Sequence, residues 1–196
     1  MSDTRIRVHD FVFRGLLAEQ ALERAGHKSN AGVFDGPDDE EVSDILSIDS
    51  LPDDLVSQAK SMSAVYTVVA AFENSVRELI SGVLLEANGE SWWDSSVSEK
   101  VRGRAEKRKE DEGKIRWHTN RGSHPIYYTT MGDLVNIIRV NWEHFEPFIQ
   151  SIDWAANIFD AVERSRNVIM HSGVLDRGDI ERLGIFMRDW IKQVGT

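Results

Sequence analysis

Apolar residues in the middle of the chain recur every three or four positions, which is the period of one face of an α-helix. Between positions 62 and 87 they are Val65, Val68, Val69, Phe72, Val76, Leu79, Ile80 and Val83. The pattern predicts one long amphipathic helix, which Asn88-Gly89 ends. Glu73 and Arg77 lie one turn apart, so we expect them to pair on its exposed face.

Two further apolar stripes with the same period follow toward the C-terminus. The first contains Leu134, Ile137, Ile138, Trp142, Phe145 and Ile149, and the second contains Ile180, Leu183, Met187, Trp190, Ile191 and Val194. Asp176 and Asp179 are the two alternatives for the N-cap of the last helix. Only the IYYTT run at 126–130 is strand-like. The sequence therefore predicts an all-α helical bundle.

Residues 1–61 are expected to form an N-terminal helix followed by an acidic linker. The apolar residues from Val8 to Leu22 have near-helical spacing, and Gly26 is the expected end of that helix. Residues 27–54 are turn-rich, and the segment 32–54 carries nine Asp or Glu and no Lys or Arg, which is typical of a solvated loop. The alternative interpretation is an acidic flap that screens a basic site. Residues 62–196 form the predicted helical domain.

Composition narrows the class of protein. The 196 residues are 41% hydrophobic, which is enough for a sizeable core. The chain has no cysteine, which excludes disulfides and thiolate metal sites and fits a reducing compartment. No apolar run approaches the ~20 residues of a membrane span, and residues 1–20 are charged rather than signal-like, so we expect a cytoplasmic protein that does not enter a membrane. The net charge of −10 argues against a broad nucleic-acid-coating surface but permits a local basic patch.

One stretch of this acidic chain is basic. Residues 98–122 carry nine Lys or Arg against five acids, and aromatic rings that can stack on bases lie in or beside them. The first interpretation is an exposed helix whose EKRKED core pairs with itself. The second is an electrostatic platform for a nucleic-acid backbone. Its candidate RNA-binding residues are Arg104, Lys107, Arg108, Lys114, Arg116, Trp117 and Arg121.

The segment RSRNVIMHSG at 164–173 combines arginine, amide and imidazole groups near the end of a predicted helix. Arg139 and His144 have a similar spacing, so the spacing by itself has little weight. In the segment, however, Asn167 follows Arg166 directly, and Ser172-Gly173 follow His171 and close the helix. The structural alternative is a plain helix end, in which His171 is a cap and Arg166 forms a salt bridge.

A helical wheel of residues 155–171 separates two faces. The apolar face contains Ala155, Ile158, Val162, Ser165 and Ile169, and the opposite face contains Asp160, Glu163, Asn167 and His171. Arg166 lies about 140° from His171 around the axis, so one isolated helix does not bring the two side chains together. Two copies that face each other would.

The RNVIMH sequence resembles the R-(polar)-x(3–5)-H signature of the HEPN superfamily, helical bundles that include many metal-independent endoribonucleases. The spacing of four segments is similar to the Swt-type branch, which is named for a nuclear RNA-surveillance endonuclease. These segments are FENSVRELI (72–80), TTMGDLVNIIRVNWEHFEPFI (129–149), FDAVERSRNVIMHSG (159–173) and DIERLGIFMRDWIKQV (179–194). The resemblance covers roughly residues 62–196, leaves residues 1–61 unassigned, and implies a HEPN-like bundle with an additional N-terminal helix.

The resemblance implies a cleft between two protomers that cuts RNA. Its catalytic residues would be Arg166, Asn167 and His171, with Glu163 and Arg164 in support. Attack by a ribose 2′-OH needs a proton acceptor near neutral pH, which an imidazole provides, and a guanidinium can bind the charge that develops on phosphorus oxygens. No metal and no cofactor is expected, and the sequence has no clear metal-ligand spacing.

Two functions follow as hypotheses. The first is a homodimeric, metal-independent endoribonuclease, a toxin or phage-defence effector with an antitoxin or other defence-system partner. The alternative is a non-catalytic HEPN module that binds RNA or a partner protein. The complete set of Arg166, Asn167 and His171 favours the first hypothesis, whereas the overall acidity favours the second.

Overall fold

The computed structural model of the chain describes residues 38–194. Residue contacts divide the chain into two units, with the division between Asp53 and Asp54, and each unit is described by itself. The helix expected from Val8 to Leu22 lies outside the described residues.

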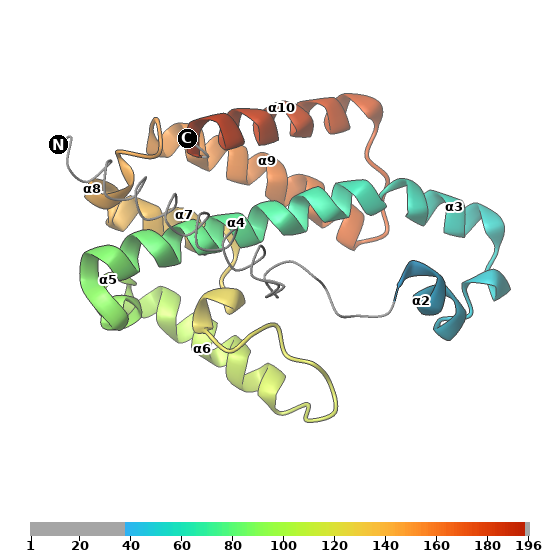
Figure 1. The fold of residues 1–196 in the computed structure, drawn as a ribbon, viewed down its shortest axis with the longest axis horizontal. Helices are drawn as coiled ribbons and strands as arrows, with labels where there is room; N and C mark the ends of the chain where they lie inside the picture. The colour runs from blue at the N-terminus through green and yellow to red at the C-terminus, as the bar shows by residue number, and fades with distance from the viewer. Residues whose placement is uncertain (1–37, 195–196) are drawn as a thin grey trace, which may run out of the picture. The chain divides into compact units, whose positions relative to one another are not determined.

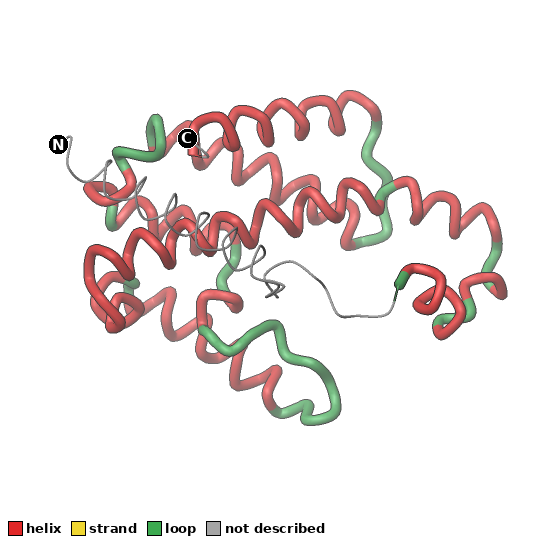
Figure 2. Tube along the Cα trace, viewed as in Figure 1, coloured by secondary structure: helices red, strands yellow, loops and turns green. Residues whose placement is uncertain are grey.

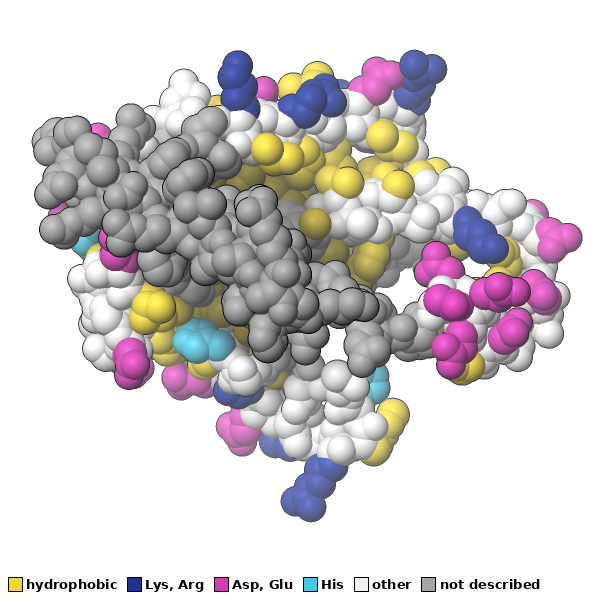
Figure 3. Space-filling model, in the orientation of Figure 1, with side chains coloured by type: hydrophobic (Ala, Val, Ile, Leu, Met, Phe, Trp, Pro, Cys, Tyr) yellow, Lys and Arg dark blue, Asp and Glu magenta, His cyan; other side chains and the backbone are white. Residues whose placement is uncertain are grey.

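The described part of the first unit, residues 38–53, is largely helical, which corrects the loop expected there, and residues 27–37 of that prediction lie outside the described residues. Helix α2 (Asp39–Ile45) begins after Asp38, whose carboxylate accepts a 2.8 Å hydrogen bond from the Glu41 amide. Acidic residues fill its first turn, where the positive end of the helix dipole stabilises them. The turn η1 (Ile48–Ser50) follows. Neither element buries a residue, and Figure 3 shows acidic side chains gathered over α2.

The second unit is a helical bundle, and residues 38–194 contain no strand, which confirms the all-α prediction (Figure 2). Its longer helices are α3 (Asp53–Ser61), which begins at the last residue of the first unit, α4 (Ser63–Asn88), α6 (Glu99–Gly113), α7 (Met131–Val140), α9 (Ile152–Met170) and α10 (Arg177–Val194). Shorter elements connect them: η2 (Gly89–Ser91), α5 (Trp92–Ser96), η3 (Pro125–Tyr128) and α8 (Trp142–Phe145). None of the described helices is both long enough and apolar enough to span a bilayer.

Helix α4 packs against α7 and α9, and α10 packs on α9, so the predicted stripes meet in one core (Figure 1). Three rings join α4, α9 and α10: Phe72 lies 5.4 Å from both Phe159 and Trp190, and Phe159 lies 5.3 Å from Trp190. Aromatic contacts of this geometry add to the free energy of apolar burial. Val68, which was expected in the α4 stripe, is exposed instead.

The strand-like run at 126–130 forms η3 and the cap of α7, which corrects the sequence interpretation. Pro125 is the first residue of η3, and proline fixes φ and has no amide hydrogen for a β-ladder. The ring nitrogen Nδ1 of His124 accepts a 3.2 Å hydrogen bond from the Ile126 amide. Thr130 and Asp133 then cap α7 reciprocally, so the backbone donors are satisfied locally and no partner strand is needed.

The N-cap of the last helix is one of the two residues that the sequence predicted for it. The Asp176 carboxylate accepts a 2.8 Å hydrogen bond from the Asp179 amide, so Asp176 is the capping residue of α10.

Candidate functional site

The segment RSRNVIMHSG forms the last turns of α9 and its exit. The Gly173 amide donates to the Val168 carbonyl at 2.8 Å, and the Ser172 amide donates to the Ile169 carbonyl at 3.1 Å. This pair of bonds is the Schellman motif, and Ser172 has the left-handed conformation that the motif requires, with φ of 61°. His171 therefore closes α9, as predicted.

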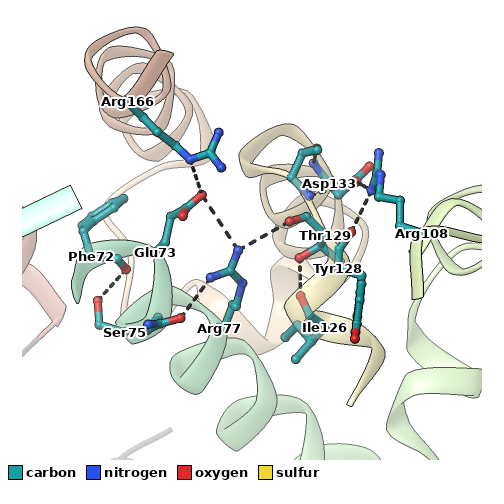
Figure 4. A network of polar contacts seen from close by, with 12 residues as sticks. Phe72, Glu73, Ser75, Arg77, Arg108, Ile126, Tyr128, Thr129, Asp133 and Arg166 are labelled. Carbon is teal, nitrogen blue, oxygen red and sulfur yellow. Dashed lines mark hydrogen bonds and ion pairs between the residues drawn. The ribbon is translucent and has the colours of Figure 1, made fainter. Parts of the chain in front are cut away.

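The cavity that Arg166 lines does not include Asn167 or His171, the other two predicted catalytic residues. Asn167 and His171 are exposed, and neither side chain forms a hydrogen bond or ion pair with another described residue. Arg166 is half-buried and points toward Glu73 of α4 (Figure 4). Within one protomer, the side chains of Arg166 and His171 therefore lie apart, as the helical wheel predicted.

Arg166 lines a hollow of about 570 Å³ together with Arg77, Arg108 and Arg121. We call this cavity the arginine hollow. Its four arginines come from α4, α6, α9 and the loop at 114–124, segments that are far apart in the sequence. The remaining lining includes three tyrosines, Tyr66, Tyr127 and Tyr128, and two carboxylates, Glu73 and Glu163.

Glu73 lies between two of these arginines (Figure 4). Its Oε1 is 3.8 Å from Nη2 of Arg77 and 3.5 Å from Nε of Arg166. The Arg77 and Glu73 side chains are only 11% and 14% exposed, which corrects the expectation that they pair on an exposed face. Arg77 also donates to Asn74 Oδ1 at 3.0 Å and to the Thr129 carbonyl at 3.5 Å.

The electrostatics of the hollow are dominated by positive charge. Burial lowers the pKa of Arg77, Glu73 opposes this shift, and the neighbouring charges of Arg166 and Arg121 lower the pKa further. Nε of Arg77 is buried and makes no hydrogen bond with a described residue. Because arginine stays protonated in proteins, the hollow holds charge that its own carboxylates neutralise only in part.

Two of the predicted RNA-binding arginines are engaged within the fold. Arg104 and Arg108 both bind the carboxylate of Asp133, whose side chain is 3% exposed, and Arg108 also donates to the Tyr128 carbonyl at 2.8 Å. Burial alone would raise the pKa of Asp133, but hydrogen bonds from Thr130 and Arg108 and the charge of Arg104 hold it below its ordinary value. Arg104 therefore stabilises the fold through its ion pair with Asp133, and Arg108 both pairs with Asp133 and lines the hollow.

Comparison of the chain with protein-family models, curated proteins and solved structures gives no match. The HEPN resemblance therefore rests on the residues quoted above. Within residues 38–194, no three His, Asp or Glu side chains gather as the ligands of a metal ion would.

The basic stretch is part helix and part loop, so the predicted RNA-binding residues do not lie on one continuous helix. Helix α6 ends at Gly113, and residues 114–124 form what we call the Trp117 loop. Glu112 fastens this loop by accepting hydrogen bonds from the backbone amide and Nε of Arg121 at 2.7 and 2.8 Å. Lys114 pairs with Asp111 at 2.7 Å on the surface.

The other predicted residues lie on open surface or outside the hollow. Lys107 and Arg116 are exposed, and the Trp117 side chain is 86% exposed. Arg164, predicted to support the site, pairs with Asp160 at 3.5 Å and lines a different cavity between α9 and α10. Glu163, the other supporting residue, does line the arginine hollow.

Sequence reasoning missed Arg77 as a member of a site, whereas Tyr127 was expected as one of the rings beside the basic stretch that could stack on bases. A weak signal existed for Arg77, because Glu73 and Arg77 directly follow the stripe residues Phe72 and Val76 and so border the buried face of α4. No local signal joined them to Arg121 and Arg166, which reach the hollow only through the packing of α9 and the fastening of the Trp117 loop.

Proposed function

We propose that this chain is a metal-independent endoribonuclease of the HEPN type, with its active site formed between two protomers. One observation carries the proposal. At the end of α9, Asn167 and His171 face solvent without a described partner, while Arg166 lies in the arginine hollow. Polar side chains that the described residues leave unpaired are available to a second copy, and a two-fold axis there would bring one arginine to the other histidine.

The proposed chemistry follows from these groups. The His171 imidazole takes the proton of a ribose 2′-OH, and the 2′ oxygen bonds to the adjacent phosphorus. The bond from phosphorus to the 5′ oxygen breaks, and this oxygen takes a proton from solvent. Arg166 stabilises the charge on the phosphorane oxygens, and Asn167 orients the phosphate. The products are a 2′,3′-cyclic phosphate and a free 5′-hydroxyl.

A second candidate function is a non-catalytic module that binds RNA or a partner protein. The observation in its favour is the Arg166 ion pair with Glu73 at 3.5 Å, which engages the guanidinium within its own chain. The set of Arg166, Asn167 and His171 favours the enzyme, because plain binding does not need an exposed imidazole beside an amide.

A cleavage assay on a panel of RNAs, with and without EDTA, tests the proposal. His171→Ala and Arg166→Ala should each lower the rate by ~10²–10⁴-fold, the usual loss for an acid–base group or an oxyanion donor. His144→Ala is the matched control, because His144 has a similar spacing from an arginine but lies in α8, away from the end of α9. Cleavage that EDTA stops, or a His171 variant as active as the parent, would refute the enzyme.

A further inference from the structure

The arginine hollow has a surplus of cations. Four guanidinium groups line it against the carboxylates of Glu73 and Glu163. Two of the four are also held from outside the lining, Arg108 by Asp133 and Arg121 by Glu112. Arg77 also donates to the neutral oxygens of Asn74 and Thr129, but the carboxylate that it shares with Arg166 is Glu73, at 3.8 and 3.5 Å, distances too long for strong charged hydrogen bonds. These two guanidiniums therefore retain unused capacity to bind an anion.

The ligand geometry of the hollow suits a phosphate. A phosphate or phosphodiester offers several acceptor oxygens to planar guanidinium groups, which bind it through paired donors. Arg77 lines the hollow, and its Nη2 has only long contacts among the described residues, 3.8 Å to Glu73 and 3.5 Å to the Thr129 carbonyl, so this nitrogen can donate to such an acceptor.

An aromatic surface adjoins the hollow. Arg121 lines both the arginine hollow and a second, shallow cavity that Trp117 and His118 border. The Trp117 indole is exposed, and Tyr127, also exposed, lines the hollow itself. A guanidinium cluster beside exposed rings is the combination that single strands use, because phosphates bind the cations while unpaired bases stack on the rings.

We propose that the arginine hollow binds a phosphodiester of single-stranded RNA through Arg77, Arg121 and Arg166, and that Trp117 stacks on a neighbouring base. The choice of RNA rests on the function proposed above, whereas the phosphate site rests on the hollow itself. Glu73 occupies the anion position when no strand is bound, since its carboxylate lies between Arg77 and Arg166.

If Glu73 competes with the phosphate, its substitution should change RNA affinity in the opposite direction from substitution of the arginines. Arg77→Gln and Arg166→Gln remove a donor to the phosphate and should each weaken binding by about tenfold. Glu73→Gln removes the competing carboxylate, so it should tighten binding severalfold. A purely structural role for this cluster would make all three substitutions act in the same direction.

The experiment measures fluorescence anisotropy of a labelled oligouridylate with 2′-O-methyl riboses, which cannot be cleaved through the 2′ oxygen. Full-length protein carries Arg77→Gln, Arg121→Gln, Arg166→Gln, Glu73→Gln or Trp117→Ala. Arg139→Gln is the charge-matched control, since Arg139 is an exposed residue of α7 outside the hollow. Each variant that replaces an arginine of the hollow should also reduce the slope of log affinity against log salt concentration by about 0.7.

Several results would overturn the proposal. Arg121 and Arg166 variants that bind like Arg139→Gln would exclude the hollow, and these side chains are 56% and 39% exposed, so their loss should not unfold the protein. Inorganic phosphate that displaces the strand at equal phosphate concentration would show a free-phosphate site. A Trp117→Ala variant with parental affinity would exclude stacking.

This experiment distinguishes failure of the binding proposal from failure of the proposed endoribonuclease activity. The uncleavable strand reports on the hollow whether or not His171 is catalytic. Arginine-dependent binding without any cleavage of natural RNA would reject the enzyme and leave the hollow, whereas cleavage that needs none of these arginines except Arg166 would reject the hollow as the strand site.

Discussion

At the residue scale, Asp133 joins several segments through one carboxylate. Arg104 and Arg108 reach it from α6, and the Thr130 amide donates to its Oδ2 at 3.1 Å from the start of α7. Because the side chain is almost fully buried, each donor removed leaves an acceptor that water cannot reach.

Asp133→Asn should lower the free energy of unfolding by about 2 kcal/mol, because a buried charge partner and one arm of the capping box are lost together. Chemical denaturation followed by circular dichroism measures the change. Asp160→Asn is the control: its partner Arg164 is exposed and 3.5 Å away, so the change should stay below about 0.5 kcal/mol. Equal effects of the two substitutions would contradict the assignment.

The same residue makes stability depend on pH. The pKa of Asp133 is depressed in the folded protein, so its contribution is complete above the unfolded-state value of about 3.9 and is lost as pH falls through the lower folded-state value. The difference between the parent and Asp133→Asn in unfolding free energy should be constant from about pH 7 to 5 and shrink below about pH 4. Denaturation series across this range measure it; a difference that grows on acidification would reverse the sign.

Ser172 occupies a position that favours glycine. Its φ of 61° is in the left-handed region, where a β-carbon is unfavourable. Ser172→Gly should therefore raise the free energy of unfolding by about 0.5 kcal/mol, less than the conformational strain itself because glycine loses more entropy on folding.

Gly173→Ala is the matched opposite of Ser172→Gly. An added β-carbon would lie 2.8 Å from the Val168 carbonyl oxygen, so this variant should be less stable than the parent. Thermal melting of the two variants checks the pair, and a stabilised Gly173→Ala would show that the end of α9 relaxes freely.

At the element scale, the periodicity of apolar residues was sufficient for the two helices with the longest apolar stripes, α4 and α10. The residues at period 3.6 predicted α4 and α10, because burial of one face is a local property of the sequence. Residues 126–130 were misinterpreted because β-branched and aromatic side chains suit strands, whereas Pro125 and the Thr130 cap decided the backbone.

The candidate site was less predictable than the helices. The wheel predicted the separation of Arg166 from His171, because both lie on one helix. The arginine hollow depends on which helices pack together and on the contact of Glu112 with Arg121, and neither is encoded by local spacing.

Trp190 should be the main attachment of α10 to the bundle. It is buried, contacts Phe72 and Phe159, and stacks on Trp154 at 5.8 Å. Trp190→Ala should cost about 3–5 kcal/mol of unfolding free energy through the cavity it leaves. The neighbouring Ile191 is 66% exposed, so Ile191→Ala should change stability by less than about 0.5 kcal/mol. Denaturant titration compares them, and similar losses would mean that α10 packs through another face.

At the scale of the whole molecule, the proposed site is incomplete in one copy. If Arg166 and His171 act across a two-fold axis, Arg166→Ala and His171→Ala homodimers are both inactive. Mixed dimers then regain one intact site of two, so co-refolding equal amounts should restore about a quarter of the parental cleavage rate. A mixture as inactive as its components, or a monomer in light scattering at tens of micromolar, would reject the composite site.

The exposure of Trp117 also gives the protein an optical property. All six tryptophans lie in the described residues, and the other five are buried or half-buried. An indole in water emits at longer wavelength than one in a core, and small quenchers in solution reach it first. The red edge of the emission spectrum therefore reports on the Trp117 loop alone, and the arrival of any ligand there can be followed in the unlabelled native chain.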